Sequence, residues 1–254
     1  MIFAIDIGNS NTHFAVYFRN KIIYLRKFPT YTQSPEKYLL AVTNKYKRKI
    51  SAIGIASVVP EKNRLWRRLI KKNFSLNPVF INNNAASPLF LNVKSPQTLG
   101  ADRICNALAA FEYFGKKENV IAVDLGTAIT YDVVLKNGKY LGGIISPGIK
   151  TMAKSLHAFT SKLPMLKKID MIMPKRVIGR NTVDAIRSGT VYSTLASFEG
   201  IIKKIENEIE IKFKIVLTGG FAEYIHASTK LKTVIRENLV LDGINHILGY
   251  KNGY

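Results

Sequence analysis

Cysteine is almost absent from this 254-residue chain, in which Cys105 is the single example. One thiol excludes a disulfide within the chain and a metal site built from several cysteines, and it fits a reducing compartment. The sequence also lacks any run of about 20 apolar residues, the length that a helix needs to cross a bilayer. The opening residues MIFAIDIGNSN carry no basic segment, and Asp6 interrupts them, so we expect a first strand and not a secretion signal. We therefore expect a cytoplasmic protein with no membrane partner.

Acidic residues are scarce. The chain has 17 Asp and Glu against 38 Lys and Arg, which leaves a formal net charge of +21. A surplus of this size favours anionic partners such as nucleotides or nucleic acids. Many basic residues fall in segments 44–49 and 61–73, and in the second Leu65, Trp66 and Leu69 form an apolar stripe. This pattern predicts a helix with a solvated basic face, and nucleic-acid binding stays an open alternative.

One short pattern occurs twice. AIDIGNSNTHFAV at 4–16 and AVDLGTAITYDVV at 122–134 align without a gap. The aligned pairs include Asp6 with Asp124, Gly8 with Gly126, and Thr12 with Thr130. In each copy the pattern predicts a strand, a glycine turn and a second strand.

The rest of the chain alternates strands and helices around these two copies. The predicted strands are 1–6, 12–18, 21–28, 51–59, 78–82, 119–126, 129–135, 139–146 and one that begins at 213; the predicted helices are 35–47, 61–73, 100–114, 181–209 and one that ends at 225. No low-complexity linker divides the halves. We expect an α/β protein with two similar domains, 1–115 and 116–254, and a nucleotide cleft between them.

The repeated turns suit a nucleoside triphosphate. A glycine directly after a strand lets backbone N–H groups approach phosphate oxygens, because it has no Cβ. The preceding Asp can hold a cation, which phosphates require. The Thr-Gly-Gly segment at 218–220 adds a third turn, suited to nucleoside contact. A single Asp-x-Gly could be only a tight turn with an Asx hydrogen bond, but two matched copies favour a phosphate site.

The order of the motifs DIGNS, GADR, DLGTAIT, GGIISPG, GRNT and TGG resembles that of type III pantothenate kinases, a family in the acetate-and-sugar-kinase/Hsp70/actin superfamily. The resemblance runs from Asp6 to about Asp242. It implies two ribonuclease-H-like (actin-like ATPase) domains and ATP-dependent phosphorylation of pantothenate to 4′-phosphopantothenate, the first step of coenzyme A biosynthesis. It also implies Mg²⁺ with ATP, a K⁺ or NH₄⁺ ion, and a homodimer with the site near its interface.

The resemblance assigns roles to individual residues. Asp102 matches the base that accepts the proton of the pantothenate hydroxyl, and Arg103, with Gly100 and Ala101, would hold the substrate. Asp124 matches the monovalent-cation ligand, and Thr182 matches a substrate contact from the other subunit. The implied ATP contacts are Asp6, which would also serve Mg-ATP, Ile7, Gly8, Asn9, Ser10, Asn11, Thr12, His13 and Thr127.

Plainer interpretations of the same residues stay open. Asp102 could be only the N-cap of its helix, and the helix dipole should keep it ionised and weakly basic. Thr182 follows Asn181 in what also reads as an ordinary helix start. The four histidines, His13, His157, His226 and His246, show no metal-ligand spacing and are interpreted as structural or surface residues. Gly142-Gly143 and Pro147-Gly148 are expected to shape a turn near the cleft.

Two departures from the family pattern motivate alternative functions. The family usually has Thr where this chain has Ser10, which keeps the hydroxyl. It commonly has Tyr three residues before the proline that precedes GxDR, where this chain has Val93. Val93 and the +21 charge leave two alternatives open: a nucleotide-binding or nucleic-acid-associated relative without turnover, and a kinase of another small hydroxy acid or polyol.

Overall fold

The structure is a computed structural model that describes residues 1–85, 88–166 and 172–251. The chain forms two compact units. Unit 1 contains Met1–Lys116, Val134–Gly142 and Asn238–Tyr254, and unit 2 contains Lys117–Val133 and Gly143–Glu237. The C-terminal segment therefore returns to the unit that contains the first strand. The boundary predicted after residue 115 stays a prediction.

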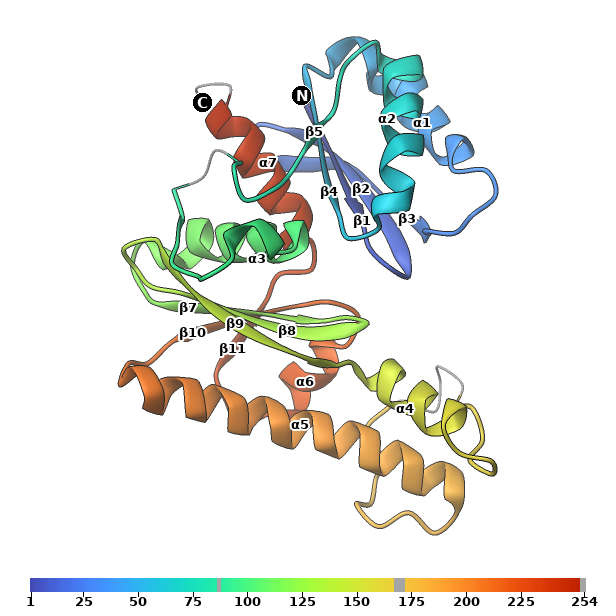
Figure 1. Cartoon of the computed structure of the whole chain (residues 1–254), viewed down its shortest axis with the longest axis vertical. Helices are drawn as coiled ribbons and strands as arrows, with labels where there is room; N and C mark the ends of the chain where they lie inside the picture. The colour runs from blue at the N-terminus through green and yellow to red at the C-terminus, as the bar shows by residue number, and fades with distance from the viewer. Residues whose placement is uncertain (86–87, 167–171, 252–254) are drawn as a thin grey trace. The chain divides into compact units, whose positions relative to one another are not determined.

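The first sheet has the order β3-β2-β1-β4-β5 (Figure 1). Its strands are β1 (Ile2–Ile7), β2 (Asn11–Phe18), β3 (Lys21–Pro29), β4 (Ala52–Ser57) and β5 (Val79–Phe80). The first three strands pair antiparallel, and β4 and β5 add to β1 in parallel. The three-strand start and the parallel strand at 51–59 are thus confirmed. The strand ends at Ser57, and Pro60 opens the following helix.

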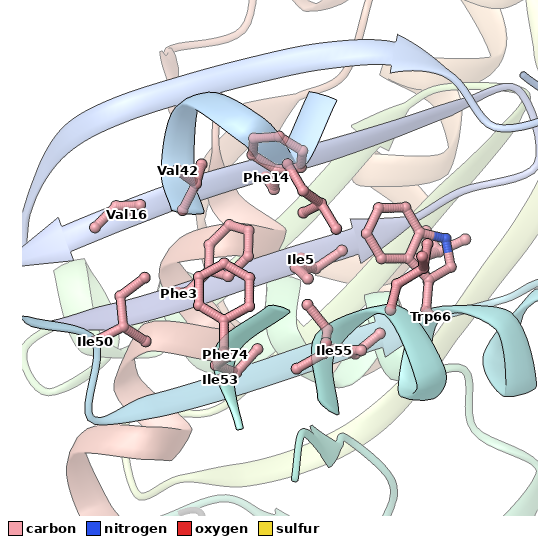
Figure 2. Close-up of a cluster of buried hydrophobic side chains, with 14 of the residues drawn as sticks. Phe3, Ile5, Phe14, Val16, Val42, Ile50, Ile53, Ile55, Trp66 and Phe74 are labelled. Atoms are coloured by element: carbon pink, nitrogen blue, oxygen red, sulfur yellow. The ribbon is translucent and has the colours of Figure 1, made fainter. Parts of the chain in front are cut away.

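One face of this sheet packs on α1 (Glu36–Tyr46) and α2 (Pro60–Phe74). Alternate strand residues point to one face, so Phe3 and Ile5 join Trp66 in a buried cluster, which Figure 2 shows. The rings of Phe3 and Phe14 meet edge to face at 5.3 Å. The basic side chains of α2 point away from this cluster, which confirms the predicted solvated face; the exposed ones are Arg64, Arg67, Arg68, Lys71 and Lys72.

The other face of the sheet packs on α7 (Leu239–Lys251), which in turn contacts α3 (Ala101–Ala110). A Cβ on Gly54 would lie 2.5 Å from Cγ2 of Ile244, and a Cβ on Gly243 would overlap the carbonyl of Cys105. Gly54 therefore allows α7 to pack closely on β4, and Gly243 allows α7 to pack closely on α3. Because α3 is enclosed, every residue from Ile104 to Ala110 is buried.

A buried carboxylate fixes α7 to the rest of unit 1. Asp242 is 8% exposed and accepts hydrogen bonds of 2.7 Å from the Tyr17 hydroxyl and 3.1 Å from the Tyr113 hydroxyl. Tyr17 lies in β2, and Tyr113 lies in a π-helical segment, Phe111–Gly115, that follows α3. Two charge-assisted bonds of this kind offset the cost of burying the carboxylate and join three elements.

The second sheet repeats the order of the first. It contains β6 (Phe90–Leu91), β7 (Val120–Leu125), β8 (Ala128–Val134), β9 (Lys139–Pro147), β10 (Lys214–Thr218) and β11 (Thr233–Ile235). Its order is β11-β10-β7-β8-β9-β6, so β9-β8-β7-β10-β11 corresponds to β3-β2-β1-β4-β5. The repeat predicted from the sequence is therefore a repeat of topology. Gly142 and Gly143, expected in a turn, lie inside β9.

The helices of unit 2 are α4 (Ile149–Ala158), α5 (Thr182–Ile209) and α6 (Ala222–Ser228). The long helix predicted at 181–209 is confirmed as α5. Phe198 of α5 stacks on Tyr131 of β8 with 6.4 Å between ring centroids, which packs the helix on the sheet. Two short 3-10 helices occupy Lys47–Lys49 and Pro96–Thr98.

Among the described residues, no helix combines the length and the apolar character that crossing a bilayer requires.

Candidate functional site

The first glycine turn connects β1 to β2. The amide of Gly8 donates to the carbonyl of Asn11 at 3.1 Å, and the Thr30 hydroxyl donates to the carbonyl of Gly8 at 2.6 Å. The Thr30 amide also donates to the carbonyl of Ser10. Asn9 and Ser10 are exposed at the tip, and Thr12 is buried with its hydroxyl 3.0 Å from that of Thr30. Thr30 therefore stabilises the predicted phosphate loop through these hydrogen bonds. No sequence motif indicated this role.

The second glycine turn, which connects β7 to β8, is one residue shorter. The Gly126 amide donates to the carbonyl of Ala128, two residues on, whereas the Gly8 amide reaches three residues on. Thr12 and Thr130 align in the sequence without a gap, but they stand at different positions in the strands that follow the two turns: Thr12 is the second residue of β2, and Thr130 is the third residue of β8. The residue types agree, but the two loops differ in length after the glycine.

The start of α4 packs directly on this second turn. The carbonyl of Thr127 accepts from the Gly148 amide at 3.0 Å and from the Thr151 hydroxyl at 2.5 Å. A Cβ on Gly148 would overlap the carbonyl of Gly126 and lie 2.7 Å from that of Thr127. Gly148 is the residue before α4 and not merely part of a turn, and only glycine fits there.

Asp124 lies beside the third glycine turn. Thr218 of β10 pairs with Asp124 of β7, so the carboxyl ends of these parallel strands meet. Gly219 has φ +92°, and a Cβ there would lie 2.5 Å from Oδ1 of Asp124 and 2.7 Å from the backbone of Leu125. Unit 2 thus brings Asp124, Thr127 and Gly219 to one edge of its sheet, where ligands of open α/β sheets bind.

Asp102 lies at the second position of α3, not at its N-cap. Gly100 is the N-cap and makes no side-chain cap bond. Oδ1 of Asp102 accepts a 2.8 Å hydrogen bond from the backbone amide of Arg103, and a Cβ on Gly100 would lie 2.5 Å from that oxygen. The N-cap interpretation is therefore wrong. The glycine of the Gly-Ala-Asp-Arg motif leaves room for the carboxylate.

Burial raises the pKa of Asp102, whereas the hydrogen bond and the positive charge of Arg103 oppose that shift. The net direction is upward, because removing a carboxylate from water disfavours its charged form. The expectation that the helix dipole would leave Asp102 weakly basic is therefore wrong in sign. A carboxylate with a raised pKa is the better proton acceptor near neutral pH.

Asp6 and Asp102 approach the same side chain although 96 positions separate them in the sequence. Burial raises the pKa of the Cys105 thiol well above its usual value, and the charges of Asp6 and Asp102 raise it further. Strand alternation accounts for the approach, because Ile5 and Ile7 fill the cluster under α1 and α2 while Asp6 points to the opposite face. Asp6 and Asp102 therefore lie on the same side of the first sheet, where both charges act on Cys105.

Arg103 contacts the sheet through Tyr140. Its Nη2 donates a 2.9 Å hydrogen bond to the Tyr140 hydroxyl. Val93 stands where the family commonly has a tyrosine. It lies against β9, because its Cγ1 is 3.6 Å from the position that a Cβ on Gly142 would take. The predicted substrate arginine thus has a tyrosine partner, contributed by β9.

Thr182 is the first residue of α5 and is exposed. Asn181 caps the helix, since its side-chain oxygen accepts from the Asp184 amide at 2.8 Å, as the ordinary helix-start interpretation predicts. A role for Thr182 in binding stays a prediction.

His13 pairs with Asp6 across β1 and β2. Burial, and then the charge of Lys27, lower its pKa to about 4. The unfolded chain therefore takes up a proton between about pH 6.5 and pH 4 that the folded chain does not, so stability falls as the pH falls through this window.

We expect His13→Gln to lose less stability on acidification than the original chain. Between pH 7 and pH 5 the difference should be about 1–2 kcal/mol in the free energy of unfolding, measured by urea titration. His246, whose pKa burial also lowers, should leave part of the acid loss in place. An equal loss of stability in both proteins would show that folding does not lower the pKa of His13.

Comparisons with known proteins agree with this geometry. A profile of the type III pantothenate kinase family matches residues 2–204. A type III pantothenate kinase of Sulfurihydrogenibium sp. is 36% identical over 96% of this chain and 98% of its own length.

Solved structures resemble the fold at low sequence identity. A Campylobacter jejuni protein named as a candidate Baf family transcriptional activator superposes with a TM-score of 0.59 at 22% identity, over 99% of this chain and all of its own. A candidate N-acetylmannosamine kinase from Listeria monocytogenes gives a TM-score of 0.55 at 14% identity, over 99% of both chains. The prediction of two ribonuclease-H-like domains is confirmed, and the chain belongs to the type III pantothenate kinase family.

Proposed function

We propose that this protein transfers the γ-phosphoryl group of ATP to the primary hydroxyl of pantothenate and forms 4′-phosphopantothenate, the first step of coenzyme A biosynthesis. The observation that carries the proposal is Asp102: a carboxylate with a raised pKa, next to an arginine, in the Gly-Ala-Asp-Arg motif of a family member. The acceptor offers both a hydroxyl for the carboxylate and a carboxylate for the arginine.

Asp102 would orient the acceptor hydroxyl and accept its proton. The transition state of phosphoryl transfer is loose, so positioning matters more than the strength of the base. Arg103 would bind the acceptor carboxylate, for which a planar guanidinium fork is better shaped than an ammonium group.

The glycine turns would bind the phosphates. The turn at Gly8 exposes Asn9 and Ser10 at its tip, and the turn at Gly126 exposes Thr127. Glycine keeps the backbone of each turn open to phosphate oxygens, and hydroxyl and amide side chains add further donors.

The family implies ATP with a divalent metal, and the residues fit that requirement. Mg²⁺ is commonly held by one or two carboxylates together with substrate phosphates, so Asp6 beside its phosphate loop suffices. For the monovalent cation we propose Asp124. Its carboxylate borders Gly219, where a Cβ would come within 2.5 Å of Oδ1, and oxygen ligands suit K⁺ as they suit other hard cations.

We propose a homodimer in which the start of α5 contacts the partner subunit. Phe159 is 88% exposed, Val177 63% and Ile178 81%, and these exposed fractions are high for large apolar side chains. The backbone around Val177 and Ile178 is held on α5, because the Ser188 hydroxyl donates to the carbonyl of Val177. These apolar side chains are therefore presented from a fixed segment close in sequence to Thr182.

Ile178→Asp should convert the dimer to a monomer, because a charge in an apolar interface is left without a partner. Sedimentation velocity would measure the state, and the pantothenate KM should rise about tenfold as Thr182 of the partner is withdrawn. Leu40→Asp, at a residue of α1 that is 57% exposed, is the matched control and should leave both values unchanged. A monomeric original chain, or an Ile178→Asp protein that stays dimeric, would contradict this interface.

The function is tested by ADP release with Mg-ATP and a panel of acceptors: pantothenate, shorter hydroxy acids and polyols. Turnover that depends on pantothenate supports the proposal. Turnover with another acceptor alone would indicate a changed substrate. ATP binding without turnover on any acceptor would favour the relative that has lost catalysis.

A further inference from the structure

One hydrogen bond links the predicted base and substrate arginine to the sheet. Arg103 follows Asp102 in α3, and its Nη2 donates to the Tyr140 hydroxyl at 2.9 Å. Tyr140 has no exposed surface. Hydrogen bonds from a charged donor are about twice as strong as neutral ones. The guanidinium therefore has a strong partner on the protein itself.

The strand pairing holds Tyr140 in place. Leu91 of β6 pairs with Tyr140 of β9, and the Asn92 amide donates to the Tyr140 carbonyl at 2.9 Å. The turn that leads into β9 is closed by a 2.9 Å hydrogen bond from the Leu135 amide to the carbonyl of Lys139. The phenol thus projects from a backbone that is bonded on both sides.

Val93 follows Asn92 on the same edge and lies against Gly142. Its aliphatic side chain has no hydrogen-bonding atom, so it contributes nothing polar to Arg103. Tyr140, two residues before Gly142 on β9, supplies a hydroxyl instead.

We propose that Tyr140 is a positioning residue whose hydroxyl fixes the Arg103 guanidinium in the orientation that receives the acceptor carboxylate. This inference rests on the proposed function. A guanidinium presents its N–H donors in a rigid planar fork, so a hydrogen bond that fixes one Nη also fixes the orientation of the fork that a carboxylate would contact. The expected effect is on acceptor binding, because the proposed partner of Arg103 is the acceptor carboxylate and not the transferred phosphoryl group.

Tyr140→Phe removes the hydroxyl and keeps the buried ring. We expect the KM for pantothenate to rise roughly 5- to 20-fold, with kcat and the KM for ATP within twofold, the pattern of lost uniform binding. Pantothenol, in which an alcohol replaces the carboxylate, is the diagnostic acceptor: its KM should be the same in both proteins. Tyr46→Phe, which removes another buried hydroxyl of unit 1, is the matched control and should change neither constant.

The same substitution in an Arg103→Ala background should raise the pantothenate KM by less than a further twofold, because the group through which Tyr140 acts is already absent. A full additional effect there, an equal effect with pantothenol, or an unchanged pantothenate KM in Tyr140→Phe would overturn this inference while leaving the kinase intact. An original chain that neither binds nor phosphorylates pantothenate would overturn the proposed function and this inference together.

Discussion

Asp102→Asn should lower kcat with pantothenate about 10²- to 10³-fold, because the amide cannot accept the proton of the hydroxyl or orient it in the same way. The KM for ATP should stay within about threefold. The free energy of unfolding should stay the same or rise, since burial raises the pKa of the carboxyl and the charged form therefore costs stability at neutral pH. Steady-state kinetics and urea unfolding on the same preparations would measure all three.

Glu36→Gln is the matched control for this experiment. Glu36 is an exposed carboxylate in the first turn of α1, as Asp102 is a carboxylate in the first turn of α3. Its replacement should change kcat by less than twofold. An Asp102→Asn enzyme with nearly full kcat would remove Asp102 from catalysis and leave it a structural residue of α3.

Gly219→Ala should damage both stability and ATP binding. The residue has φ +92°, and a Cβ would meet Oδ1 of Asp124 at 2.5 Å and the backbone of Leu125 at 2.7 Å. A side chain in this backbone region, pressed against main-chain atoms, should cost about 2–3 kcal/mol of stability. Because the turn must move away from Asp124, the KM for ATP should rise about tenfold or more.

Gly220→Ala provides the comparison for stability, because a Cβ on Gly220 would meet nothing within 4 Å. Its free energy of unfolding should stay within about 0.5 kcal/mol of the original. If Gly219→Ala lost stability while the KM for ATP stayed the same, the turn would be structural and ATP would bind elsewhere.

The repeated strands were predictable because their signals are local. Alternating apolar residues and short Gly or Asn turns specify β1 to β3 and β7 to β9 within a few dozen residues. The position of α7 was not predictable, because it depends on contacts between distant segments. Gly243 meets Cys105, and Asp242 accepts from Tyr17 across 225 positions.

In the candidate site, too, the features set by local sequence were predictable and those set by tertiary packing were not. The resemblance of the motifs identified Asp102 and Arg103, but the pKa direction of Asp102 could not be read from its place at a helix start. Burial by the surrounding fold raises the pKa of Asp102 by more than the backbone hydrogen bonds and the charge of Arg103 lower it. Thr30 and Tyr140 belong to no motif. The pairing of β3 with β2 brings Thr30 to Gly8, and tertiary packing brings Tyr140 of β9 to Arg103 of α3.

The most direct test of pantothenate phosphorylation by this protein is the identity of the phosphorylated product. The protein would be incubated with Mg-ATP and pantothenate in K⁺ buffer and again in Na⁺ buffer, and the products analysed by ³¹P–¹H correlation NMR. In K⁺ buffer we expect one phosphate monoester coupled to the primary CH₂ of pantothenate, formed together with ADP, and in Na⁺ buffer much less of it. Formation of inorganic phosphate alone, or of no product by folded protein that binds ATP, would contradict this expectation.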